Sequence, residues 1–219
     1  GVGKTTVSLN LGWALDAVIV DADLGATDFP QSQGPGIHDV LAGRIKSNEA
    51  VERIGSVDVL SANYATEGAR AADLQRFPEA ISRLDRMHET VVIDCPAGLA
   101  QDLGVFLDTA DFAVLVTTPK PPARADASRT RELAIELGTP LSTVVVNKVP
   151  DETYGSAAGE KLCTEIEAEL RAAPIAIPYQ SSVATTQADG DPIGTVEPDS
   201  AAAQQFETLA ERQRGIIIR

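Results

Sequence analysis

The chain begins with a glycine-rich run that ends in lysine and two threonines, and this run constrains the fold more than any other feature. It reads Gly1-Val2-Gly3-Lys4-Thr5-Thr6, and a segment with helical spacing follows it at Thr5–Leu15. Glycine lets backbone N–H groups approach phosphate oxygens, lysine neutralises β- and γ-phosphates, and a threonine hydroxyl is a Mg²⁺ ligand. Because a helix start attracts anions, the run predicts a nucleotide-phosphate site. The alternative is a chance glycine-rich turn before a helix.

A phosphate loop of this kind normally joins the C-terminal end of a buried strand to a helix. The full pattern G-x-x-x-x-G-K-[ST] also needs a glycine five positions before Gly3, and the sequence does not contain that position. We therefore expect the sequence to be a fragment that lacks about ten residues, enough for a central strand and part of the loop.

Short β-branched runs alternate with helical patterns along all 219 residues, of which 43% are apolar. Continuous apolar runs are typical of parallel strands covered on both faces. The pattern predicts one P-loop NTPase-like domain over residues 1–219, a doubly wound α/β fold with a mostly parallel sheet of about seven strands and helices on both faces. The predicted strands are Ala17–Val20, Val57–Leu60, Val91–Ile93, Phe112–Val116, Thr143–Val146 and Ile175–Ile177, and the predicted helices are Thr5–Leu15, Leu74–Met87, Asp126–Leu137, Glu160–Leu170 and Ser200–Arg212.

The net charge is -14, with 32 Asp and Glu against 18 Lys and Arg. Such a charge repels nucleic-acid phosphates and anionic membranes, so composition gives no sign of a nucleic-acid partner. An ordinary acidic surface explains this balance, and so does adaptation to a high-salt cytosol, where charges are screened within about 3 Å at 1 M salt. We favour the high-salt explanation. Cys95 and Cys163 lie too far apart for a paired-cysteine signature, and a reduced, cytoplasmic setting is expected.

Three aspartates follow predicted strands. Asp94 ends the run Val91–Ile93, which is the expected form of a Walker B carboxylate that holds Mg²⁺ directly or through water. Asp21 and Asp23 are two residues apart on an extended segment, so both carboxylates point to one side. Each could instead cap a turn. Together with the loop, they predict a Mg²⁺ site formed by Thr5, Asp21 and Asp94.

In order and spacing these motifs resemble those of the MinD/ParA family, and the resemblance extends from Gly1 to about Pro192. The chain is most similar to the acidic MinD-like ATPases of halophilic archaea. The motifs that carry the resemblance are Gly1–Thr6, Val20-Asp21-Ala22-Asp23-Leu24-Gly25, Val91-Val92-Ile93-Asp94-Cys95-Pro96-Ala97-Gly98 and Val116-Thr117-Thr118-Pro119.

The resemblance implies a Mg²⁺-dependent ATP-binding switch that forms a homodimer on ATP. Such a switch hydrolyses ATP slowly, responds to an activating partner that the sequence does not identify, and positions a division site, polar machinery or DNA cargo. It implies that Asp23 orients the attacking water, with Asp21 as its metal-associated neighbour, and that Lys4 bears phosphate charge. Lys4 and Asp23 are therefore the predicted catalytic residues.

The resemblance also implies roles outside the loop. Asn147, Pro178 and Gln180 lie where the family holds adenine, although Asn147 equally fits a strand-end turn. Asp126 resembles an acidic residue of the dimer and partner surface, and Pro96-Ala97-Gly98 lies in the position of switch II.

Three features depart from the family pattern. The lysine that the family carries early in its fuller loop would lie before Gly1. The end of the chain, Glu211–Arg219, forms a poor amphipathic stripe, so membrane binding is not expected. No basic patch for DNA stands out, since Arg124, Arg129 and Arg131 share their segment with acidic residues and are interpreted as a solvated mixed face.

Two other classes of function remain open. A nucleotide-gated scaffold would bind ATP tightly without releasing phosphate. An ATP-dependent metabolic ligase or synthetase would need a pocket for a second substrate, which neither Gly98–Asp108 nor the last third of the chain suggests. An iron–sulfur carrier is disfavoured by the absence of paired cysteines.

Overall fold

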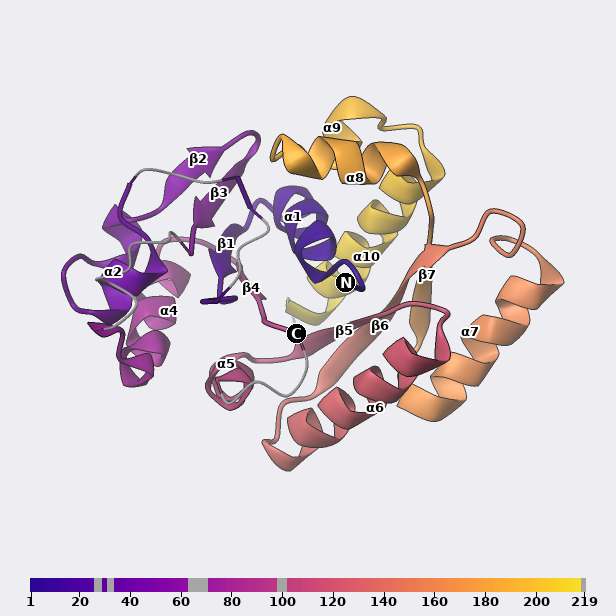
Figure 1. Cartoon of the computed structure of the whole chain (residues 1–219), viewed down its shortest axis with the longest axis horizontal. Helices are drawn as coiled ribbons and strands as arrows, with labels where there is room; N and C mark the ends of the chain where they lie inside the picture. Colours follow the sequence, from indigo (N-terminus) through magenta and orange to yellow (C-terminus); the bar gives the residue numbers. More distant parts are fainter. Residues whose placement is uncertain (26–28, 31–33, 63–70, 98–101, 218–219) are drawn as a thin grey trace.

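The strands are divided between two sheets (Figure 1). The computed structural model describes residues 1–25, 29–30, 34–62, 71–97 and 102–217. The first sheet has the order β2-β3-β1-β4, and only the pair β2 and β3 is antiparallel. The second has the order β5-β6-β7 and is parallel. The predicted α/β class with mostly parallel strands is confirmed. The strands are β1 (Val18–Asp21), β2 (Glu52–Ile54), β3 (Val57–Leu60), β4 (Val91–Asp94), β5 (Ala113–Thr117), β6 (Leu141–Val149) and β7 (Pro174–Pro178).

Helices cover both faces of each sheet. On the four-stranded sheet, one face packs under α2, α4 and α5 and the other under α1. On the three-stranded sheet, Val144 and Val146 face α6 and α7, whereas Val145 faces α1 and α10. The α-helices are α1 (Lys4–Ala14), α2 (Ile37–Leu41), α4 (Phe77–Asp85), α5 (Leu103–Thr109), α6 (Pro121–Glu136), α7 (Ala157–Leu170), α8 (Ser181–Ala188), α9 (Ile193–Val196) and α10 (Ala201–Ile217), and the 3₁₀-helices are η1 (Ser47–Glu49) and η2 (Leu74–Arg76).

Prolines account for two differences from the predicted helices. The segment expected as one helix over Leu74–Met87 is the short η2 followed by α4, with Pro78 in the first turn of α4. Helix α6 begins at Pro121 rather than at Asp126. Proline has no backbone N–H, and the N–H groups of a first helical turn have no acceptor within the helix. Proline is therefore tolerated in the first turn, and both helices begin at or just before a proline.

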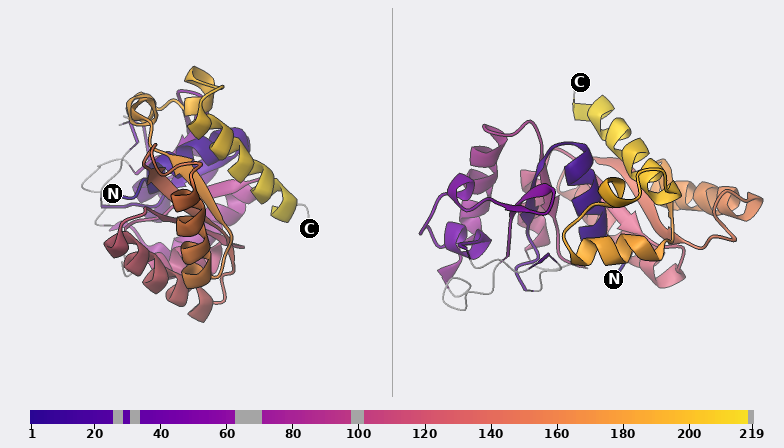
Figure 2. Two further views of the ribbon diagram at one scale, coloured as in Figure 1. Left: turned by 90° about the vertical axis from the view of Figure 1, so that its right-hand side faces the viewer. Right: turned by 90° about the horizontal axis from the view of Figure 1, so that it is seen from above.

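The last helix runs to Ile217 rather than ending at Arg212, and its C-terminal end stands at the edge of the molecule (Figure 2). Two side chains between the predicted end at Arg212 and the observed end at Ile217 make contacts that the sequence pattern did not indicate. The guanidinium of Arg214 donates to the carbonyl of Ala14 at the end of α1, and Gln213 is buried. The predicted end was therefore wrong because Gly215 does not terminate a helix that is held by packing.

Candidate nucleotide-binding site

The predicted phosphate loop leads directly into α1. Gly3 is the residue before the helix and has φ 94° and ψ 39°, a left-handed conformation. The side-chain amide of Asn147, at the end of β6, donates to the carbonyl of Val2 at 3.0 Å. The ammonium of Lys148 donates to the carbonyl of Gly1 at 3.0 Å. The loop is thus held from the C-terminal end of the neighbouring strand.

Gly3 has no room for a side chain. A Cβ at this position would lie 2.3 Å from Nδ2 of Asn147. We expect Gly3→Ala to destabilise the fold by more than the about 1–2 kcal/mol that a left-handed non-glycine residue costs, because Asn147 must also give up its bond to Val2. Urea unfolding checks this. Gly138→Ala is the matched control, since Gly138 has φ 81° but no atom within 4 Å of its Cβ position. Equal losses in the two variants would contradict the close contact.

The first turns of α1 carry polar side chains that are buried. The hydroxyl of Ser8 donates to Oδ1 of Asp94 at 3.0 Å, and the hydroxyl of Thr5 also bonds this carboxylate. Thr6 donates to the side chain of Gln187 in α8. These contacts orient the start of α1 against β4 on one side and α8 on the other. The first four N–H groups of the helix have no acceptor within it, so they are available to an anion.

The predicted carboxylates meet at one edge of the first sheet. Asp21 and Asp94 end β1 and β4 and are register partners, and they are 1% and 2% exposed. Oδ1 of Asp21 accepts from the N–H of Asp23 at 3.2 Å. Its Oδ2 accepts from the N–H of Ala62 at 3.3 Å. Asp23 is half-buried beyond the strand, close enough to raise the pKa of Asp94 through its charge.

Burial raises the pKa of Asp94 to about 6, and the Thr5 and Ser8 hydroxyls and the charge of Lys4 oppose this shift. A carboxylate held in this way gains from a nearby cation. The oxygen donors of Thr5, Asp21 and Asp94 are the kind that Mg²⁺ prefers. Within the described ranges, no three His, Cys, Asp or Glu side chains gather as a metal cluster.

The predicted adenine residues lie at the C-terminal ends of β6 and β7. Pro178 is the register partner of Val149, and Asn147 is buried. Asn147 supports the loop, and Oε1 of Gln180 accepts from the N–H of Ala202 at 2.8 Å, at the start of α10. Both side chains therefore have partners within the fold, and their contact with adenine stays a prediction.

Sequence reasoning missed four residues that position the loop: Ser8, Asn10, Lys148 and Gln187. Asn10 donates to the carbonyl of Thr6 at 2.8 Å and accepts from the N–H of Ile193 at 2.8 Å. Only Ser8 had a usable signal, because it lies three residues after Thr5 and hence on the same side of a helix. The partners of the others come from distant segments.

The remaining predicted residues lie away from the loop or beyond the description. Asp126 is exposed on α6 and pairs with Arg129. Arg124 pairs with Glu169 of α7, and Nε of Arg131 donates to the carbonyl of Leu170 at 2.8 Å. These contacts agree with a mixed charged face. Gly98, the last residue of the predicted switch II segment, lies outside the described residues. No helix in the described part of the chain is long and apolar enough to cross a membrane.

Comparison with known proteins agrees with this geometry. The family model described as ParA, NUBPL iron-transfer P-loop NTPase, matches residues 1–213. The chain belongs to the MinD/ParA family of P-loop NTPases. One relative in this family is an uncharacterized ATP-binding protein of Methanocaldococcus jannaschii, 30% identical over 227 residues that cover 98% of this chain and 84% of that protein.

Solved MinD structures share the fold. The cell division ATPase MinD of Pyrococcus furiosus aligns with a TM-score of 0.84 and 28% identity, covering 99% of this chain and 94% of that one. The septum site-determining protein MinD of Pyrococcus horikoshii, complexed with Mg-ADP, aligns with a TM-score of 0.79 and 27% identity over the same shares, 99% and 94%.

Proposed function

We propose that this chain binds ATP with Mg²⁺ at Gly1–Thr6 and hydrolyses it, as a MinD/ParA-type switch that forms a homodimer on ATP and positions a cellular component. The observation that carries the proposal is the meeting of the loop with two buried carboxylates. Asp94 bonds Ser8 of α1 at 3.0 Å and is the register partner of Asp21. A phosphate-binding helix start and a metal-binding edge therefore share one place.

Each residue has a distinct part in the proposed mechanism. The N–H groups of the loop and the ammonium of Lys4 bear the charge of the β- and γ-phosphates. Thr5, Asp94 and Asp21 would hold Mg²⁺, which supplies further neutralisation of phosphate charge when bound. Asp23, beyond the end of β1, orients the attacking water. Asn147 and Lys148 keep the loop in the shape that these contacts need.

The relatives support the nucleotide in this proposal. The M. jannaschii relative is described as ATP-binding, and the P. horikoshii MinD structure contains Mg-ADP. Homodimer formation and an activating partner protein are proposed from family membership. The cytoplasmic location and the high-salt adaptation stay predictions.

Turnover with an Asp23 variant tests the proposal. We expect Asp23→Ala to lower the rate of phosphate release about 100-fold, a typical loss when a group that handles the attacking water is removed. ATP affinity should change by less than about threefold, which corresponds to less than about 1 kcal/mol of binding free energy. Asp108→Ala is the control, because Asp108 is an exposed carboxylate on α5.

Two outcomes would contradict the proposal. If Asp23→Ala released phosphate as fast as the unchanged chain, Asp23 would not orient water. If the unchanged chain bound ATP tightly but released no phosphate with candidate partners present, it would be a nucleotide-gated scaffold. Light scattering with ATP and with ADP tests the homodimer, which should form with ATP only.

A further inference from the structure

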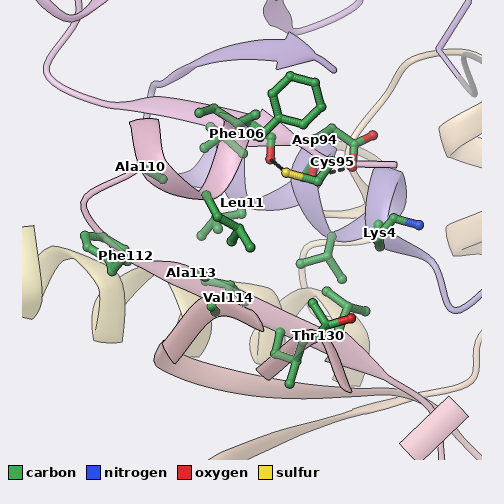
Figure 3. A pocket seen from close by; sticks show the side chains of 18 of the residues that line it. Lys4, Leu11, Asp94, Cys95, Phe106, Ala110, Phe112, Ala113, Val114 and Thr130 are labelled. Carbon is green, nitrogen blue, oxygen red and sulfur yellow. Dashed lines mark hydrogen bonds between the residues drawn. The ribbon is translucent and has the colours of Figure 1, made fainter. Parts of the chain in front are cut away.

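The structure contains a charged cavity at some distance from the phosphate loop. The cavity beside the loop is lined by Lys4 and Asp94 together with many apolar side chains (Figure 3). The charged cavity, of 320 Å³, lies between the turn after α2 and the start of α4. These two helices are neighbours on the face of the four-stranded sheet opposite α1, at the left of Figure 1. We call this cavity the basic pocket.

The basic pocket has more positive than negative side chains in its lining. Its charged residues are the basic Arg44, Lys46, Arg76 and Arg83 and the acidic Glu49 and Glu79. The pocket therefore has an excess of two positive charges, whereas the whole chain has a net charge of -14. Most of the surface of such a chain repels anions. The basic pocket is thus a place where a small dianion finds matching charge.

The floor of the basic pocket is part of the folded core. Val40 and Ala80 are buried members of a hydrophobic cluster, and Ile45 packs against that cluster. The hydroxyl of Ser47, which is also buried, donates to the carbonyl of Ala80 at 2.8 Å. This bond ties the segment after α2 to α4. The charged side chains are therefore mounted on a packed framework rather than on separate surface segments.

A close approach brings cations from two segments together. Gly43 has φ 73°, and a Cβ at this position would lie 2.6 Å from Nη1 of Arg76. The guanidinium of Arg76, in η2, therefore lies against the turn that also carries Arg44 and Lys46. Like charges that are held near one another repel. An anion between them would relieve this repulsion.

The carboxylates around the pocket engage these cations only weakly. Nζ of Lys46 is 3.6 Å from Glu49, and Nε of Arg76 is 4.0 Å from Asp73. Both distances are longer than a hydrogen bond. All four side chains are at least half exposed, and exposed pairs of this kind contribute little to stability. An anion with better geometry can therefore take over these donors.

We propose that the basic pocket binds a phosphate dianion. The guanidinium groups of Arg76 and Arg83 offer the forked N–H donors that suit phosphate oxygens, and Lys46 adds a point charge. A phosphate monoester has a charge of about -1.5 to -2 at neutral pH, which matches the excess charge of the pocket. A long polyanion would extend onto the acidic remainder of the surface. The phosphate is therefore that of a small free anion or of a phosphorylated residue on a partner protein.

Site-resolved titration of the 219-residue chain tests the proposal. Inorganic phosphate and a short phosphoserine peptide are added separately, and the NMR shifts of the backbone amides in residues 43–49 and 76–83 are followed. We expect saturable shifts with a Kd on the order of 1 mM. They should persist in the Lys4→Ala protein, which excludes the phosphate loop as their cause. Similar affinities would identify a free anion as the ligand, whereas peptide binding at least about tenfold tighter would identify a partner protein.

A pair of double variants shows whether the position of the cations matters. Arg76→Gln with Arg83→Gln should weaken phosphate binding at least about tenfold, because the forked donors are lost. Arg53→Gln with Arg129→Gln is the matched control. These two exposed arginines do not line the pocket, and they pair with Asp58 and Asp126. The control removes the same charge and should leave the affinity within about twofold.

Removing the two acidic side chains of the lining should have the opposite effect. Glu49→Gln with Glu79→Gln leaves the cations in place and removes their competing partners, so phosphate binding should tighten about threefold. A folding defect cannot produce such a gain. Three results would overturn the proposal: no shifts in residues 43–49 and 76–83 up to about 10 mM phosphate, equal losses in the two arginine double variants, or equally tight binding of a peptide with glutamate in place of phosphoserine.

Discussion

Replacing Lys4 with alanine is expected to lower the affinity for ATP about 100-fold and to abolish measurable turnover. Lys4 is the first residue of α1, and its charge lowers the pKa of Asp94. Its ammonium is therefore close enough to Asp94 for its charge to act on that carboxyl group. A charge-assisted hydrogen bond contributes about 1.5–3 kcal/mol, and about 2.7 kcal/mol corresponds to a 100-fold change in affinity. Isothermal titration with ATP and Mg²⁺ measures the affinity.

The control for this prediction is Lys46→Ala. Lys46 pairs with Glu49 at 3.6 Å in an exposed 3₁₀ turn, so its loss also removes one positive charge from the chain. ATP affinity should be unchanged in this variant. A comparable loss of affinity in both variants would mean that net charge, and not the position of Lys4, determines binding.

Asp94→Asn is expected to stabilise the nucleotide-free protein at neutral pH while removing its response to Mg²⁺. Burial raises the pKa of Asp94 from 3.8 to about 6. Between these two pH values the carboxyl group is therefore protonated in the folded state and ionised in the unfolded state. The carboxyl group therefore lowers stability progressively as pH rises from about 4 to about 6. The difference corresponds to about 3 kcal/mol above that range. Asparagine carries no charge and avoids this penalty.

Urea unfolding of both proteins from pH 4 to pH 8 checks this prediction. The stability difference should be small at pH 4, grow through pH 6 and then stay constant. Asp108→Asn, which neutralises an exposed carboxylate on α5, should give no comparable rise. An Asp94→Asn protein that is less stable than the unchanged chain at pH 7 would show that the hydrogen bonds from Ser8 and Thr5 outweigh the burial of charge.

The sequence allowed the α/β class and the edge of the site to be predicted because both depend on local patterns. Buried β-branched runs give parallel strands, and an aspartate at the end of such a run lies at the C-terminal edge of the sheet. This logic predicts that Asp21 and Asp94 lie together, and the structure has them as register partners. The start of α1 could also be predicted, because a helix is expected directly after the glycines and Lys4 of a phosphate loop.

The residues that hold the loop could not be predicted in the same way. Asn147 fits a strand-end turn as well as a ligand contact, and the sequence does not show that its amide reaches Val2. Gln187 and Ile193 reach the loop helix only because α8 and α9 fold back onto it. Short helices such as α8 and α9 have weak local signals, since tertiary packing rather than propensity stabilises them.

The bond between Asn10 and Ile193 has a consequence for the order in which the chain is made. The two residues are 183 positions apart in sequence, and Thr6 is tied to Gln187 over 181 positions. A ribosome adds about 5–20 residues each second, so the loop helix waits for roughly ten seconds or more before its partners have been synthesised. During that time the polar side chains of α1 have no native acceptors on α8 and α9. The helix that follows the phosphate loop is therefore completed only after segments more than 180 positions later in the chain have been translated.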